Sequence, residues 1–306
     1  MQARAMGERE TVPANPLSRL LHRRSPLPAE AEAAIQRLGR LVQEQPDLEA
    51  LAAINATLIQ TMYTHELHVP YVSIHRDHAA VKQEAGLPLL RGEPISYDPV
   101  GLRDQFMRLC GVMHDHGNQF ADELRRVAKA GTFPVADLAV EVIAGEPGNV
   151  AARADALGLD AGLGATLLRL TLFPSMVRLA ATFEPLLGTE TWRRGYCPVC
   201  GAWPLLGEYR GLELTRFLRC GLCAAAWESD RLVCPICDNR VFQDLNNLTV
   251  EGEELKQRAT TCERCHCYIK QISTLVPIPP AELLVADLET LHLDLIAHER
   301  AFMPPQ

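Results

Sequence analysis

Eight of the ten cysteines in this 306-residue chain fall into four Cys-x-x-Cys pairs. Two intervening residues make a tight turn that points both sulfurs, and several backbone N–H groups, at one ion. Two such turns facing each other supply the four sulfurs of a tetrahedral metal site. The spacing therefore predicts two four-cysteine metal sites, built from Cys197/Cys200, Cys220/Cys223, Cys234/Cys237 and Cys262/Cys265.

The distances along the chain indicate which pairs belong together. The first and second pairs lie 19 residues apart and the third and fourth 24 apart, whereas only 10 residues separate the two halves. Short loops close at a lower entropic cost, which favours consecutive pairing. The predicted ligand sets are Cys197, Cys200, Cys220 and Cys223 for one ion and Cys234, Cys237, Cys262 and Cys265 for the other. A cross-braced arrangement, with the first pair joining the third, is the alternative.

Disulfides are the main competing interpretation of paired cysteines. A secreted disulfide scaffold is expected to carry a signal peptide, and no such segment is recognisable here. Cysteines in spaced pairs instead fit a reducing cytoplasm, where thiols remain available for metals. We therefore expect a cytoplasmic protein that uses these cysteines to bind metal. Tetrathiolate sites accept both iron and zinc, so the sequence leaves the metal open.

Composition and charge limit the possible partners. Hydrophobic residues at 47% and charged residues at 22% are typical of a soluble chain with a sizeable core. The formal charge is −8, which disfavours nucleic acid and anionic membranes. Residues 192–270 hold 11 Lys or Arg and 10 Asp or Glu, so eight thiolates and two ions would make this region acidic. No run approaches the ~20 apolar residues that a membrane span requires, and we expect no membrane insertion.

The pattern of apolar residues predicts an α+β chain. Residues 1–25 are polar and are expected to form a loose arm, and residues 26–190 an all-helical domain with its longest helix over 157–187. Two small β modules that are rubredoxin-like or zinc-ribbon-like follow, at 191–230 and 231–276, then a C-terminal helix and tail at 277–306. Hairpin strands are expected at 203–209 with 215–219 and at 241–250 with 255–261, and a closing strand at 268–275.

Other residues capable of chemistry have simpler interpretations. His65, His68, His75 and His78 form pairs three residues apart, and His114 and His116 flank Asp115. Surface or helix-capping roles are favoured for these histidines over metal binding. Cys110 lies on an apolar helical stripe and is most simply a small core residue. Nothing resembles a phosphate-binding glycine loop or a nucleophile elbow, so we expect no enzyme.

The cysteine-rich third of the chain resembles a known family. The residues on which the resemblance rests are Cys197-Pro-Val-Cys-Gly with Trp203-Pro204, Leu218-Arg219-Cys220, Trp227, Arg231, Cys234, Arg258, Cys262-x-x-Cys265, Tyr268-Ile269-Lys270, Asp287-Leu-Glu-Thr290 and Leu293-Asp294. This set is similar to that of the formate dehydrogenase accessory protein FdhE over about residues 195–298, and the match is weaker before them. Cys267 departs from the pattern as an extra thiol past the fourth pair.

The resemblance implies a function and a cofactor. It implies a cytoplasmic maturation protein that contacts the catalytic subunit of formate dehydrogenase, and it implies two rubredoxin-like iron ions. A rubredoxin-type electron carrier and a nucleic-acid-binding zinc-ribbon protein are the alternatives, and the acidic charge disfavours the second. We expect a docking groove between the helical domain and the metal modules. Its polar rim is expected to include Asp287, Glu289 and Asp294 on the last helix.

Overall fold

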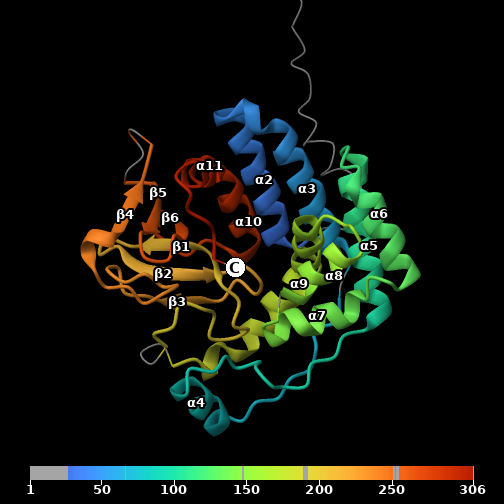
Figure 1. Ribbon diagram of the computed structural model, residues 1–306, viewed down its shortest axis with the longest axis horizontal. Helices are drawn as coiled ribbons and strands as arrows, with labels where there is room; N and C mark the ends of the chain where they lie inside the picture. The colour runs from blue at the N-terminus through green and yellow to red at the C-terminus, as the bar shows by residue number, and fades with distance from the viewer. Residues whose placement is uncertain are drawn as a thin grey trace, which may run out of the picture.

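The computed structural model describes residues 27–65, 67–146, 148–188, 192–250, 252 and 255–305. The predicted arm at 1–25 lies outside these residues. The fold is α+β, as predicted: helices, then strands carrying the cysteines, then helices again (Figure 1). The first helices are α2 (Ala29–Glu44), α3 (Glu49–Thr64), α4 (Arg76–Glu84), α5 (Pro99–Asp115), α6 (Phe120–Ala130), α7 (Val135–Ala144), α8 (Gly148–Ala156) and α9 (Ala161–Phe183). Single 3-10 turns follow Gln45, Phe183 and Val241.

Local chemistry explains where several helices begin and end. The carboxylate of Asp98 accepts hydrogen bonds from the backbone N–H of Val100 and Gly101, at 3.1 and 3.0 Å, and so caps α5. At the end of α6, Gly131 adopts a φ of 78°, a left-handed conformation that glycine reaches without strain. Helix α8 was not predicted, because it buries only Val150 and Ala154 and therefore leaves a weak apolar pattern in the sequence.

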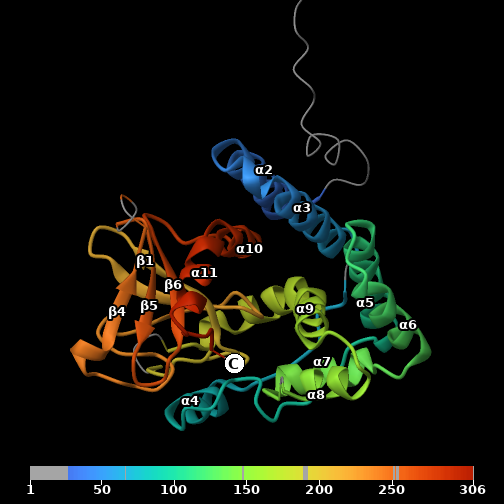
Figure 2. The same ribbon diagram turned by 45° about the horizontal axis from the view of Figure 1, so that its top comes forward.

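The apolar helix α9 lies at the centre of the molecule. Its length and composition, taken with the turn up to Leu186, would allow it to cross a membrane, and it is the single such helix in the described part of the chain. The sequence predicted no such segment, because no run was judged to approach the ~20 apolar residues that a span requires. In the structure 61% of its most apolar window is buried among neighbouring elements. A core helix of a globular protein has the same character. Figure 2 shows α9 and α10 between the sheet on one side and α5–α8 on the other.

The two cysteine modules are joined in one six-stranded sheet. The strands are β1 (Pro204–Arg210), β2 (Thr215–Cys220), β3 (Ala226–Glu228), β4 (Leu245–Leu248), β5 (Gln257–Cys262) and β6 (Tyr268–Thr274). The order in the sheet is β3-β2-β1-β6-β5-β4, so each half keeps its predicted hairpin. The halves join where β1 pairs with β6 in parallel, from Gly207↔Gln271 to Arg210↔Thr274.

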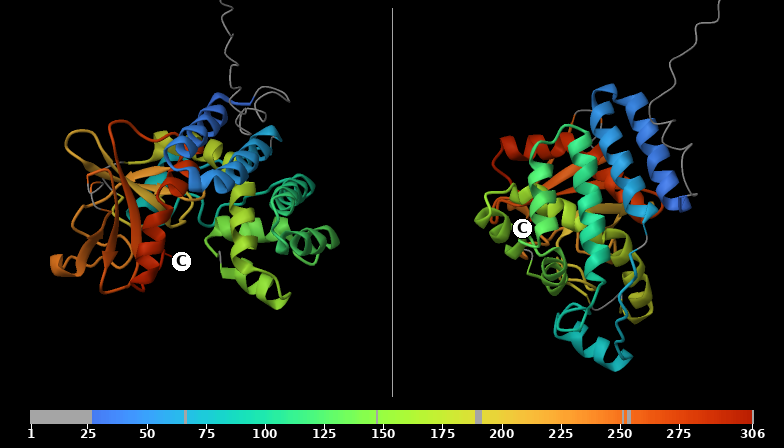
Figure 3. Two further views of the ribbon diagram at one scale, coloured as in Figure 1. Left: turned by 90° about the horizontal axis from the view of Figure 1, so that it is seen from above. Right: turned by 90° about the vertical axis from the view of Figure 1, so that its right-hand side faces the viewer.

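The chain after the sheet forms two helices where one was predicted: α10 (Pro280–Glu289) and α11 (Leu291–Glu299). The break is at Thr290, whose buried hydroxyl donates to the backbone carbonyl of Ala286 at 2.8 Å. Helix α10 packs on α2, and α2 lies beside α3 (Figure 3). Arg37 of α2 forms ion pairs with Glu282 and Glu289 of α10, at 3.0 and 2.5 Å. The C-terminal helices therefore tie the sheet back to the first helices.

Candidate metal centres

All four Cys-x-x-Cys pairs adopt the same backbone turn. In each, the N–H of the first cysteine donates to the carbonyl five positions later, and its own carbonyl accepts the N–H four positions later, at 2.9–3.2 Å. The residue after the second cysteine is left-handed in every turn, with φ of 52–82°. These left-handed residues are Gly201, Ala224, Asp238 and His266. The repetition shows that the Cys-x-x-Cys spacing sets the same local geometry whatever side chains surround it.

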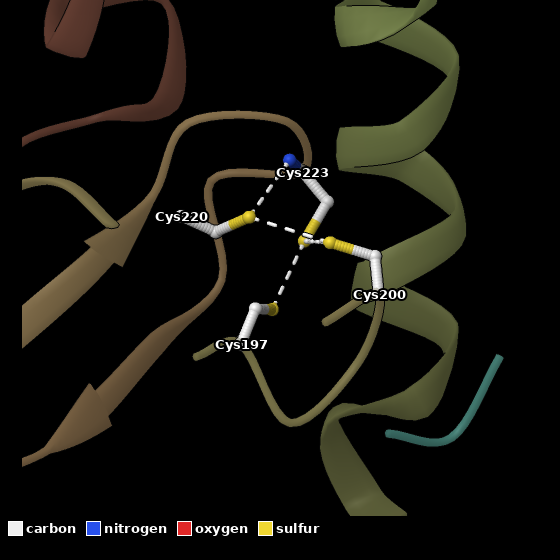
Figure 4. Close-up of side chains that lie close together, drawn as sticks. All are labelled: Cys197, Cys200, Cys220 and Cys223. Atoms are coloured by element: carbon white, nitrogen blue, oxygen red, sulfur yellow. Dashed lines mark hydrogen bonds between the residues drawn. The ribbon is translucent and has the colours of Figure 1, made fainter. Parts of the chain in front are cut away.

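The first group brings together Cys197, Cys200, Cys220 and Cys223 (Figure 4). The first two precede β1 and the last two lie at or just after the end of β2, so all four lie at the open end of the β1–β2 hairpin. The Sγ atoms of Cys197 and Cys223 are 3.6 Å apart. The Sγ of Cys200 lies 3.4 Å from that of Cys220 and 3.7 Å from that of Cys223. The backbone N–H of Val199 donates to Cys197, and those of Leu222 and Cys223 donate to Cys220. All four cysteines are buried.

The second group brings together Cys234, Cys237, Cys262 and Cys265. Its Sγ–Sγ distances are 3.7 Å for Cys234–Cys265 and 3.7 Å for Cys237–Cys262. The side-chain amide of Asn239 donates to the sulfur of Cys262 at 3.6 Å. Cys237 and Cys265 are partly exposed, so this group lies nearer the surface than the first.

Both groups have the dimensions of a tetrathiolate metal site. A metal–sulfur bond of about 2.3 Å places the sulfurs of a regular tetrahedron about 3.8 Å apart, and the measured separations are 3.4–3.7 Å. Within the described ranges, no other cluster of three or more His, Cys, Asp or Glu could hold an ion. The predicted consecutive grouping is thus the one the structure has. That these eight cysteines ligate metal remains a prediction.

Without an ion the first group resists carrying several negative charges. Burial and the adjacent thiols raise the pKa of Cys223 well above its ordinary value. Burial also acts to raise the pKa of Cys220, but hydrogen bonds from the other three thiols and from the N–H of Cys223 outweigh it and lower that pKa. Four thiolates at this spacing therefore need a cation to offset their repulsion, and metal uptake releases protons.

The first group is embedded between the helices and the sheet. The backbone N–H groups of Leu89 and Leu90 donate to the carbonyls of Pro198 and Val199 in the first turn, at 2.8 and 2.9 Å. The buried ammonium of Lys82 holds this loop by donating to the carbonyls of Leu89 and Arg91. On the other side, Arg169 of α9 donates to the carbonyl of Gly221 in the second turn at 3.0 Å. The first group therefore connects α9, and the loop of Leu89 to Arg91 that follows α4, to the sheet.

A buried ion pair supports the second turn of this group. Glu208 of β1 is fully buried and pairs with Arg219 of β2, and Arg210 approaches the same carboxylate at 2.6 Å. Arg219 also donates to the carbonyl of Ala224, the left-handed residue of the turn, and to that of Ile278. No role was predicted for Glu208, Lys82 or Arg169. For Glu208 and Arg169, a charged residue inside an apolar strand or helix was the available signal.

The second group borders a groove of about 940 Å³. One wall is formed by Cys234, Pro235 and Cys237, and the other by residues near the end of α4 and by the segment that enters the first turn, including Trp192 and Tyr196. This groove lies between the helical part and the sheet, where a docking surface was predicted. The acidic residues predicted for its rim are engaged elsewhere. Asp287 and Asp294 pair with the buried Lys270, at 2.6 and 2.7 Å, and Glu289 pairs with Arg37.

The difference in burial predicts that the two ions leave at different rates. We expect a thiol-blocking reagent or a chelator to release the second ion first, because the sulfurs of Cys237 and Cys265 are accessible and those of the first group are not. Stopped-flow detection of released metal should show two phases of about equal amplitude. A single phase, or loss of the slow phase in the Cys237→Ser variant, would contradict this order.

The remaining candidate residues stay outside both groups. Burial raises the pKa of Cys110 to about 12, as expected of an inert core thiol. The ring of His75 accepts the backbone N–H of Asp77 at the start of α4, and His114 lies 3.0 Å from Asp122. These are the capping and surface roles predicted for the histidines. The thiol of Cys267 donates to the carbonyl of Cys265 at 3.5 Å and is not among the eight grouped sulfurs.

Comparison with known proteins finds relatives that carry the name of the family that the cysteine pattern resembles. No family model matches the chain. It is 40% identical over 109 residues to the "Protein FdhE homolog" of Stutzerimonas stutzeri, a match covering 35% of each chain. It is 24% identical over 285 residues to the "Protein FdhE homolog" of Aquifex aeolicus, covering 90% of this chain and 93% of the relative.

A solved structure extends the likeness to the fold. The crystal structure of the FdhE protein from Pseudomonas aeruginosa superposes with a TM-score of 0.61 at 20% identity, over 91% of this chain and 95% of that one. The 40% identical match spans about a third of its relative, whereas the Aquifex match and the superposition span nearly the whole chain. Together, these comparisons show that the chain, with its two four-cysteine groups, is similar to FdhE proteins over nearly its whole length and shares the fold of one of them.

Proposed function

We propose that this protein is a non-enzymatic accessory factor for the maturation of formate dehydrogenase. In this proposal it binds the catalytic subunit in the cytoplasm and carries an ion in each four-cysteine group. The observation that carries the proposal is the pair of tetrahedral-sized sulfur groups in a chain related to FdhE proteins. The eight cysteines would hold the ions, and no described residue outside them forms a comparable cluster.

We propose iron in both groups, with zinc as the alternative. Backbone N–H groups that donate to the sulfurs, as in the first group, disperse thiolate charge and suit a ferric as well as a ferrous ion. The ions would supply structural cross-links and, if iron, a one-electron couple. The absorption spectrum of freshly purified protein separates these cases, because ferric tetrathiolate is red and zinc tetrathiolate colourless.

The groove beside the second group is the proposed docking surface for the partner. Its walls come from the helical part and from the turn that carries Cys234 and Cys237, so its shape depends on both. A groove of about 940 Å³ is large enough for a segment of polypeptide. A rubredoxin-type electron carrier would not need a groove formed jointly by a large helical part and a metal-binding turn. The net charge of −8 likewise disfavours a nucleic-acid-binding role.

A binding experiment tests this function. We expect tagged wild-type protein to capture the catalytic subunit of formate dehydrogenase from a cytoplasmic extract. Groove variants Arg193→Ala and Tyr196→Ala should capture less of it, because both residues line the groove and neither is buried. Cys110→Ser, in the core of the helices, is the matched control and should capture as much as wild type. Capture that is unchanged in a variant lacking all eight paired cysteines, together with restored formate dehydrogenase activity, would refute a role for the metal groups.

A further inference from the structure

Arg216 of β2 belongs to the first half of the sheet, yet its side chain reaches the second cysteine group. It is 1% exposed and is the largest fully buried side chain described. Its Nη2 donates to the carbonyl of Val233 at 2.9 Å and to the hydroxyl of Ser229 at 2.8 Å. Val233 directly precedes Cys234, so the guanidinium lies beside the third Cys-x-x-Cys turn.

This guanidinium differs from the other buried cations. In the described part of the chain, the buried cations are Lys82, Arg216, Arg219 and Lys270. Lys82 pairs with Glu93, Arg219 with Glu208, and Lys270 with Asp287 and Asp294. Arg216 forms no ion pair within 4.0 Å with any described carboxylate, and its Nε has no hydrogen-bond partner. A buried cation without a compensating negative charge is strongly unfavourable.

The second cysteine group lies beside this guanidinium. Arg216, Cys234 and Cys262 line the same small void, of about 10 Å³, which has hardly room for one water molecule. Asp230 is also near, but it is half-exposed and lies 3.9 Å from both Arg193 and Arg240. Four thiolates around a divalent ion carry a net charge of −2, which a neighbouring guanidinium would offset.

We propose that Arg216 is the counter-cation of the second metal site: it offsets the charge of the Cys234, Cys237, Cys262 and Cys265 thiolates and thereby strengthens ion binding there. The first half of the sheet thus supplies a charge that the second group needs. This assignment is independent of any partner protein, since it concerns only the affinity of one site for its ion.

The test measures zinc affinity at each site in the full-length protein. Wild type, Arg216→Met and Arg216→Lys are loaded with zinc and titrated with a competing chromogenic chelator. The Cys237→Ser variant, which lacks a second-site ligand, identifies the signal of that site. We expect Arg216→Met to weaken zinc binding at the second site by about 10- to 100-fold, the usual loss when a group supporting metal ligands is removed. Arg216→Lys keeps the charge and should retain wild-type affinity.

Arg231→Met is the matched control. Arg231 is exposed, and its guanidinium lies 5.6 Å from the centre of the Tyr209 ring, in the same neighbourhood. The substitution removes one positive charge that is already solvated, so zinc binding should not change. First-site affinity should also be unchanged in every one of these variants.

Three results would overturn the assignment. One is wild-type affinity at the second site in Arg216→Met. Another is equal weakening by Arg216→Lys and Arg216→Met, since that would show a role in hydrogen bonding or packing. The third is loss of zinc from both sites in Arg216→Met and in Arg216→Lys, since that would show that Arg216 stabilises the fold as a whole.

Discussion

Replacing Cys200 with serine should remove one of two bound ions and loosen the junction between the helices and the sheet. The loss is large because a four-sulfur site contributes about 10 kcal/mol or more to folding, comparable with the whole stability of a domain. The first turn is held by Leu89 and Leu90, and the second by Arg169, so the damage should spread into the helical part. Elemental analysis and thermal unfolding followed by far-ultraviolet circular dichroism measure both effects.

Two matched variants make this result specific. Cys237→Ser should also lose one ion, but it should leave the melting of the helices nearly unchanged, because a groove separates the turn that carries Cys237 from the end of α4. Cys267→Ser should keep both ions, since that thiol lies outside the grouped sulfurs. The expectation fails if Cys237→Ser lowers the melting temperature as much as Cys200→Ser does.

The second large effect is expected at Glu208. The Glu208→Gln substitution leaves Arg219, which is 4% exposed, without its negative partner. Breaking a buried ion pair in this way costs about 3–5 kcal/mol. Urea denaturation of metal-loaded protein measures the change in the free energy of unfolding. Arg210 approaches the same carboxylate and should lose its contact too.

An exposed ion pair provides the control for this measurement. Glu123 and Arg126 pair at 2.5 Å on the surface of α6, and Glu123→Gln should leave the free energy of unfolding unchanged within error. A loss below about 1 kcal/mol for Glu208→Gln would show that water reaches the Arg219 guanidinium and that the pair is not truly buried.

The sequence was most informative where the structure depends on short-range spacing. The Cys-x-x-Cys turns, their consecutive grouping and the two hairpins all follow from contacts close in sequence, and the described structure has them. The helices with strong apolar stripes were predicted equally well. An example is α5, in which Leu102, Phe106 and Leu109 are buried.

What could not be predicted depends on contacts distant in sequence. The pairing of β1 with β6 joins residues such as Gly207 and Gln271, and no local pattern encodes which strand a half-sheet will accept as its neighbour. The ion pairs of Lys270 with Asp287 and Asp294 explain why an acidic helix edge was mistaken for a free surface. Charge alone does not show whether a carboxylate already has a partner inside the same chain.

The parallel seam between β1 and β6 also has a consequence for synthesis on the ribosome. The β1–β2 hairpin and the first cysteine group are complete in sequence by Cys223, but β6 begins only at Tyr268. Until β6 emerges, β1 presents an open strand edge, which is the kind of surface that recruits other nascent chains. Slow translation of residues 224–267 would prolong that interval, so aggregation during expression should depend on codon usage in this stretch more than on codon usage in the helices.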